Sequence, residues 1–350
     1  MLNDAMRKAL LSALLLLLGR AVLAADYTAY YDLINTAERK FIAHRDSSCY
    51  VEYDLAFAQF RPYVKDPYIA AQIAFSLKDE RRLLHFLGIA ARQGMPITAL
   101  DAAPLLRRGL DARQRALVAQ VFKDAQVQPP ERADLFDFIC TQCHVSDSIK
   151  LVMGTDTERI RAFRTSEEAT RRFLLDSFLV HGRYINERVL GITTTAGRAS
   201  FLQRTGRRDP YAEYGQLPPE ENELRLKCPM NIVLHSKCFF SDHQDLFARA
   251  MRNGYLHPKD FAILAETAVL WHHGTDDGGE ACTLSPDPNG YFNVFRGPRQ
   301  ATFTSTPEGL LQVERNRATI HLQTYAADEA KHVLEQQHGF AFFFDFVDRP

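Results

Sequence analysis

The stretch YTAYYDLINTAERKFIAH, residues 27–44, decides the fold class of this chain. Its apolar side chains recur at spacings of three and four, so a single stripe of an α-helix carries Tyr30, Leu33, Ile34, Ala37 and Phe41. The next stretch, SCYVEYDLAFAQF at 48–60, repeats this spacing and stops before Pro62. Asp66 and Pro67 then supply an N-cap and a first-turn proline for another helix. The N-terminal part of the chain is therefore predicted to be helical throughout.

Small residues repeat in this region with a period of 34. Ala37 and Ala71 are 34 residues apart, as are Ala56 and Ala90. Tetratricopeptide repeats have this period, and their small residues let the two helices of a pair approach closely. The rest of that consensus is absent, so an unrelated helical bundle is the alternative. We predict a degenerate tetratricopeptide-like array over residues 26–125.

The turn-rich stretch AQVQPPE, residues 125–131, is the best candidate for a domain boundary. A second helical domain is expected over residues 131–280, with a long ordered loop over 191–230. Its helical patterns lie at about 132–152, 157–164, 166–190 and 241–274.

The C-terminal segment, residues 281–350, has a mixed pattern. It is expected to hold a short β-hairpin, then a final helix from about Val313 to Gln336. The apolar run FAFFFDFV at 340–347 is expected to form a strand or a docking tail. The predicted fold is mainly α, with this small β-containing segment at the end.

Residues 1–24 have the layout of a secretory signal peptide. Arg7 and Lys8 precede an apolar run from Ala9 to Leu18, and small residues allow cleavage after Ala24. The run is too short to span a bilayer, so we expect a periplasmic or secreted protein without membrane insertion. The formal net charge of -1 over 350 residues gives no electrostatic basis for binding nucleic acid.

The stretch FICTQCHVSD, residues 138–147, contains the Cys-x-x-Cys-His spacing of c-type haem attachment in Cys140, Cys143 and His144. In that chemistry two thiols one helical turn apart add to the haem vinyl groups, and the imidazole binds the iron. The alternative is that both cysteines lie on the apolar stripe of a helix or form disulfides elsewhere. We favour the alternative because Met230 and a few histidines are the only conceivable distal ligands. No cofactor is expected, and haem c is the minority hypothesis.

Two clusters of histidines and carboxylates are weaker candidates for a metal or catalytic site. They consist of His235, Cys238, Asp242 and His243, and of His272, His273, Asp276, Asp277 and Glu280. Neither spacing matches a zinc-finger, His-Glu-x-x-His or EF-hand pattern, and hydrolase and nucleotide-binding motifs are also missing. No metal or catalytic residue is predicted. An unrecognised enzyme would need a cleft between the domains that converges on His235, His272 or Asp276.

Several of these stretches resemble a family of uncharacterised exported bacterial proteins. Its members pair tetratricopeptide-like helices with a helical domain of unknown function. The likeness rests on the helices of 26–125, on a helix with Asp147, on FARAMRNGYLHPKDFAILAE at 247–266, and on ERNRATIHLQTY at 314–325. The chain departs from the family pattern at His321, which replaces a usual glycine, and in its Cys-x-x-Cys-His motif. The resemblance implies the fold and export but assigns no chemistry.

The expected function is binding. Stacked helical pairs leave a groove that typically receives a peptide or a partner protein. We expect Tyr30, Tyr31 and Tyr53 to be among the side chains that line it. The sequence does not identify the protein or peptide that would bind there.

Overall fold

Every regular element in the described part of the chain is a helix, which confirms the mainly α fold. The computed structural model describes residues 26–153, 156–192, 195–208, 228–234, 238–271, 291–294 and 306–343. The expected signal peptide at 1–24 lies outside these ranges. Within them, no helix combines the length and apolar character that crossing a bilayer requires.

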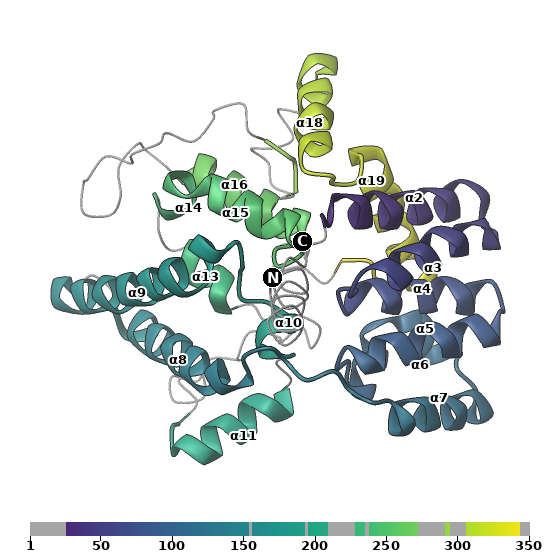
Figure 1. The fold of residues 1–350 in the computed structure, drawn as a ribbon, viewed down its shortest axis with the longest axis horizontal. Helices are drawn as coiled ribbons and strands as arrows, with labels where there is room; N and C mark the ends of the chain where they lie inside the picture. The colour runs from purple at the N-terminus through teal and green to yellow at the C-terminus, as the bar shows by residue number, and fades with distance from the viewer. Residues whose placement is uncertain are drawn as a thin grey trace, which may run out of the picture.

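The N-terminal helices stack on one side of the molecule (Figure 1). They are α2 (Thr28–His44), α3 (Tyr50–Gln59), α4 (Lys65–Ser76), α5 (Glu80–Arg92), α6 (Pro104–Gly109) and α7 (Ala112–Asp124). Helix α2 packs on α3, α4 on α5, and α5 on α7. All four alanines of the 34-residue period, Ala37, Ala56, Ala71 and Ala90, are fully buried. The predicted helical content of 26–125 is confirmed, and the tetratricopeptide-like arrangement stays a prediction.

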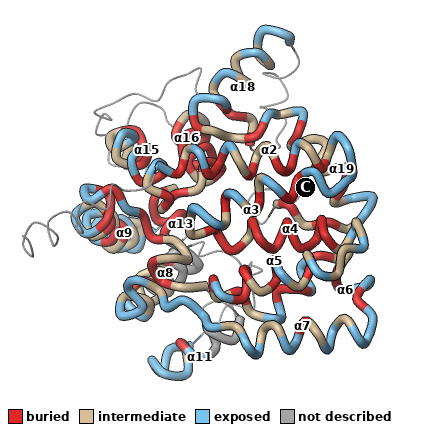
Figure 2. Tube along the Cα trace, turned by 45° about the vertical axis from the view of Figure 1, so that its right-hand side comes forward, coloured by how far each residue is buried: buried red, intermediate tan, exposed pale blue. Residues whose placement is uncertain are grey.

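The second group of helices follows a non-helical connection at 125–132. It comprises α8 (Phe136–Met153), α9 (Thr157–Ser177), α10 (Glu187–Leu190), α11 (Thr195–Thr205), α13 (Cys228–Leu234), α14 (Phe239–Asp242), α15 (Gln244–Arg252) and α16 (Pro258–Trp271). A contiguous apolar cluster includes buried side chains from both groups. Figure 2 shows buried residues in helices of both groups. The two groups therefore share a core.

Two helix boundaries differ from the sequence-based prediction. The pattern at 157–164 and the first part of the pattern at 166–190 belong to one helix, α9, which runs from Thr157 to Ser177. The rest of the second pattern holds a short 3-10 turn, Leu179–His181, and α10. The hydroxyl of Thr165 donates to the carbonyl of Arg161 at 3.0 Å, so this residue lies inside the helix instead of capping a new one. The expected loop at 191–230 contains α11 and the start of α13.

The helical hairpin predicted at 241–274 corresponds to α15 and α16. Pro258 begins α16, and the Nδ1 atom of His257 accepts a hydrogen bond from the backbone N–H of Lys259 at 3.1 Å. Gly254 follows α15 with φ +74°, in the left-handed region that favours glycine.

The final helix expected from Val313 to Gln336 is broken in the structure. Helix α18 (Pro307–Thr319) ends before His321, whose φ is +56°, and α19 (Tyr325–His338) begins afresh after Thr324. Buried Arg317 donates to the carbonyls of Gln323, at 2.5 Å, and Phe292, at 2.7 Å. These contacts hold the chain in the turn between the helices, and the sequence pattern gives no sign of them.

The C-terminal residues described at 339–343 and the segment at 291–294 contain no strand. The rest of the expected hairpin lies outside the described residues. Helix α19 packs beside α2, at the opposite end of the chain (Figure 1). The described part of the apolar run, residues 340–343, is joined to the N-terminal helices through hydrogen bonds between Gln72 of α4 and Ala341.

Candidate functional site

The three tyrosines expected to line a groove are buried in the core. Their exposed fractions are 0% for Tyr30, 2% for Tyr31 and 0% for Tyr53. The hydroxyl of Tyr31 donates to the carbonyl of Met251 at 2.8 Å, which joins α2 to the end of α15. The prediction that these tyrosines line an open groove is wrong. The helical stripe that carries them faces neighbouring helices. Periodicity alone cannot tell a stripe buried by other helices from one that lines an open groove.

An open groove of about 810 Å³ lies elsewhere on the N-terminal helices. Its apolar lining includes Phe41 of α2, Phe75 of α4 and Leu105 of α6, and its cationic lining includes Arg45 and Lys78.

A glycine shapes this groove. A Cβ atom at Gly109 would lie 2.5 Å from the ring of Phe75, so the backbone of α6 approaches that aromatic side chain closely. The result is a hollow with an aromatic surface, lined also by the charged side chains of Arg45, Lys78 and Glu80, which suits a peptide with apolar side chains.

The chain's own segment Gly339–Phe343 enters this region. Gly339 accepts a hydrogen bond from the backbone N–H of Leu105 at 2.8 Å. The amide of Gln72 accepts from the N–H of Ala341 at 2.6 Å and donates to its carbonyl at 2.9 Å. Phe340 lines the open groove, and its ring centroid lies 5.7 Å from that of Phe41. The N-terminal helices thus hold a non-helical segment of the chain through its backbone and an aromatic side chain.

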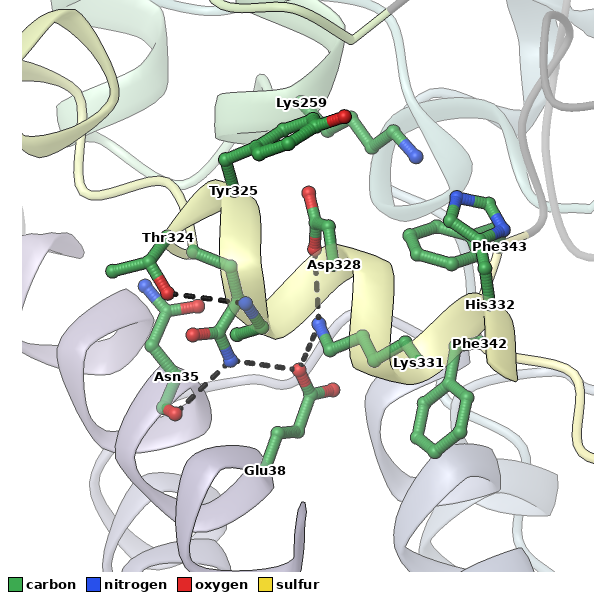
Figure 3. A network of polar contacts seen from close by, with 12 residues as sticks. Asn35, Glu38, Lys259, Thr324, Tyr325, Asp328, Lys331, His332, Phe342 and Phe343 are labelled. Carbon is green, nitrogen blue, oxygen red and sulfur yellow. Dashed lines mark hydrogen bonds and ion pairs between the residues drawn. The ribbon is translucent and has the colours of Figure 1, made fainter. Parts of the chain in front are cut away.

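A buried polar network fixes α19 to α2 (Figure 3). Lys331 forms an ion pair with Glu38 and lies 3.6 Å from the carboxylate of Asp328. The side-chain amide of Gln323 donates to Glu38 at 3.1 Å and to the carbonyl of Asn35 at 3.0 Å. The side chains of Lys331 and Glu38 are 8% and 5% exposed, so neither charge is solvated by bulk water.

A small polar cavity of about 40 Å³ adjoins this network. Tyr30, Asp66, Lys65 and His257 are among its lining residues. The Tyr30 hydroxyl donates to Asp66 at 2.5 Å, and burial raises the pKa of Asp66 to about 7, against the opposing charge of Lys65. The volume has room for a few water molecules and is too small for an organic substrate.

The Cys-x-x-Cys-His motif lies on α8, as its apolar stripe predicts. Cys140 carries a reduced thiol, whereas Cys143 is disulfide-bonded, and both are half-buried. His144 lies near Phe201, with 6.5 Å between ring centroids. A sulfur in a disulfide cannot also form a thioether, so haem attachment at Cys143 would require prior reduction. Met230, the conceivable distal ligand, is buried in α13.

The two histidine and carboxylate clusters are only partly described. Cys238 is disulfide-bonded and Asp242 closes the short helix α14. No group of three or more metal-binding side chains occurs in the described ranges. The other residues of the two clusters lie outside the described ranges: His235, His272, His273, Asp276, Asp277 and Glu280. The hypothesis of a cleft between the domains at which His235, His272 or Asp276 converge therefore also falls outside the described residues.

No family model, curated protein or solved structure matches this chain.

Sequence reasoning missed the polar residues that hold the C-terminal segment. Gln72 is the only polar side chain in the run Ile69–Phe75, and it is fully buried. A lone amide in such a run signals a buried hydrogen-bond partner, because an unsatisfied amide would be costly. Glu335 accepts from the backbone N–H groups of Phe342 and Phe343 at 2.6 and 2.9 Å, and it gives no comparable signal in the sequence.

Proposed function

We propose that this chain is an exported, tetratricopeptide-like binding module that takes up an extended peptide on its N-terminal helices. The observation that supports this function is the way in which the N-terminal helices bind the chain's own segment Gly339–Phe343. Gln72 forms paired hydrogen bonds with the backbone of Ala341, a contact that any residue except proline can make in an extended peptide. The groove beside Phe340 provides the room that a partner needs.

The partner is a peptide with aromatic side chains at alternate positions. In the chain's own segment, Phe340 and Phe342 flank Ala341, and both are buried at 5% and 4% exposure. Successive side chains of an extended segment point in opposite directions, so this spacing places both rings on the same side of the peptide. A partner peptide with this pattern would replace the chain's own segment.

Competition with the covalently attached segment provides the test. The probe is a fluorescein-labelled synthetic peptide with the sequence of residues 336–343, QQHGFAFF. A tethered segment competes at an effective concentration of about millimolar, so the wild-type protein should bind the probe weakly. The variant Phe340→Ala/Phe342→Ala weakens the tethered segment and should bind at least about tenfold more tightly by fluorescence anisotropy.

Two controls make this result specific. Gln72→Ala in the double-variant background should abolish binding, whereas Gln120→Ala, on the exposed face of α7, should leave it unchanged. If the double variant has a native circular dichroism spectrum but shows no saturable binding, the peptide-binding function is wrong.

A second candidate function is haem c binding through Cys140, Cys143 and His144. Its support is the motif spacing and the helical placement of the three residues on α8. It applies to a reduced form of the protein, because the Cys143 sulfur is engaged in a disulfide. An enzymatic site between the domains is a third hypothesis, and the small polar cavity gives it little support because of its size.

A further inference from the structure

We infer that Cys140 is a nucleophile that isomerises the disulfide of Cys143, so that α8 carries a thiol–disulfide exchange site. The inference is independent of peptide binding. It begins from the different oxidation states of two cysteines that lie three residues apart on one helix.

The helix places the two sulfurs within reach of each other. Side chains three residues apart on an α-helix are neighbours, with Cβ atoms about 5–6 Å apart. A disulfide needs Cα atoms about 4.4–6.8 Å apart and Cβ atoms about 3.5–4.5 Å apart. A helical Cys-x-x-Cys pair meets the first condition and misses the second by about 0.5–1.5 Å. Formation of a Cys140–Cys143 bond therefore requires only a local adjustment of α8.

The chemistry requires no external oxidant or reductant. The thiolate of Cys140 attacks the Sγ atom of Cys143, and the Cys140–Cys143 bond forms as the existing disulfide of Cys143 breaks. The cysteine previously bonded to Cys143 leaves as a thiolate and takes up a proton equivalent to the one released by Cys140. The numbers of thiols and disulfides stay the same.

His144 is placed to act as the base. It lies four residues after Cys140, and residues at this spacing share a helix face. An imidazole removes a thiol proton near neutral pH, and a nearby imidazolium favours the thiolate. The Cys-x-x-Cys-His motif thus combines a nucleophile, an electrophilic disulfide and a base within five residues.

Cys49 is the internal contrast. It also carries a thiol, but it is fully buried, and burial raises its pKa to about 12. Its thiolate is therefore rare at neutral pH, and reagents cannot reach it. Cys140 is only half-buried, so reagents and a neighbouring disulfide can reach its thiol more easily than that of Cys49.

Peptide mapping distinguishes the two disulfide states. The oxidised full-length protein is incubated at pH 8.5, quenched in acid, alkylated under denaturing conditions and digested with trypsin without reduction. One tryptic peptide, residues 133–150, contains both Cys140 and Cys143. Before exchange it is alkylated at Cys140 and linked to a second peptide through Cys143. After exchange it is unlinked, unalkylated and two hydrogens lighter than its dithiol form.

The expected result is growth of the unlinked form during incubation in the wild-type protein and in Cys49→Ala. Cys140→Ser should retain the original linkage throughout, with a native circular dichroism spectrum. His144→Gln should slow exchange at pH 6.5 by about tenfold or more, with little effect at pH 9, where the thiol ionises without help. If the wild-type protein never yields the unlinked form, the exchange site is refuted. Equal rates for His144→Gln and wild type at pH 6.5 would remove His144 from the mechanism.

Discussion

The side-chain amide of Gln72 holds both backbone polar groups of Ala341, accepting from its N–H at 2.6 Å and donating to its carbonyl at 2.9 Å. These two residues are 269 positions apart in the sequence. The contact joins α4 of the N-terminal helices to the C-terminal segment and satisfies the hydrogen-bonding groups of a fully buried amide.

Replacing Gln72 by alanine should lower the free energy of unfolding by about 2–4 kcal/mol, since two buried hydrogen bonds are lost and the groups of Ala341 lose their partner. Urea titration followed by circular dichroism measures the change. Gln120→Ala is the matched control, because the Gln120 amide is exposed and bonds only Asp124, one turn away on α7. Equal effects of the two substitutions would mean that the Gln72 contact contributes nothing.

The ion pair between Lys331 and Glu38 should show strong energetic coupling. Lys331→Met leaves Glu38 buried without its main counter-charge and should cost about 3–5 kcal/mol. Adding Glu38→Gln removes the isolated charge, so the double variant should be more stable than Lys331→Met alone. A double-mutant cycle in urea measures this coupling. Strict additivity of the two substitutions would contradict it.

Asp66 should make the protein less stable as the pH rises from about 4 to 7. Burial raises its pKa to about 7 in the folded state, above the value of about 3.9 in an unfolded chain, so the folded state binds the proton more tightly. This contribution to stability is complete below pH 4 and is lost as the pH rises through 7.

Between pH 4 and 8 the wild-type protein should lose up to about 4 kcal/mol of unfolding free energy through Asp66, and the Asp66→Asn variant should not show this loss. The asparagine can still accept the hydrogen bond from Tyr30. The measurement is the difference in unfolding free energy between variant and wild type at several pH values. A difference that does not change with pH would show that Asp66 has an ordinary pKa.

Gly254 should tolerate no side chain. A Cβ atom there would lie 2.5 Å from the ring of Tyr27, in addition to the strain of φ +74°. Gly206 is the control, since its φ is +65° and nothing lies within 4 Å of its Cβ position. Thermal unfolding should show that Gly206→Ala lowers the free energy of unfolding by about 1–2 kcal/mol through backbone strain alone. Gly254→Ala should lower it by a clearly larger amount.

The visible spectrum tests the haem hypothesis. Protein exported together with haem-maturation machinery should lack a Soret band, because the disulfide at Cys143 occupies the sulfur that attachment needs. A Soret band and haem stain that disappear in Cys143→Ala would overturn this expectation and make haem c binding the function.

The sequence predicted the helices of the N-terminal part well, because spacings of three and four over residues 27–124 reflect helix–helix packing that is local in the chain. It failed where single side-chain hydrogen bonds decide the course of the backbone. Arg317 holds the turn between α18 and α19 through carbonyls of Gln323 and Phe292. Thr165, which separates the patterns expected at 157–164 and 166–190, lies inside α9, where its hydroxyl donates to the carbonyl of Arg161. Neither contact leaves a periodic signal.

The sequence predicted the type of candidate site, a groove on stacked helices, but not the residues that line it. A groove on stacked helices was expected, yet Tyr30, Tyr31 and Tyr53 pack into the core, and the open groove lies by Phe41 and Phe75. A helical stripe shows that side chains are buried without showing whether a helix or a ligand buries them. The binding of the C-terminal segment depends on contacts between distant parts of the chain, such as Gln72 and Ala341, which are 269 positions apart and which no local pattern can relate.

The docking of the C-terminal segment has a consequence for biosynthesis. Gln323 and Asn35 are 288 residues apart, and ribosomes add about 5–20 residues per second, so the partner of α2 is made roughly 15–60 seconds after α2 itself. During that interval Glu38 and Gln72 lack their final partners. The nascent chain therefore presents an unfilled receptor surface that a chaperone can recognise before its own last helix arrives.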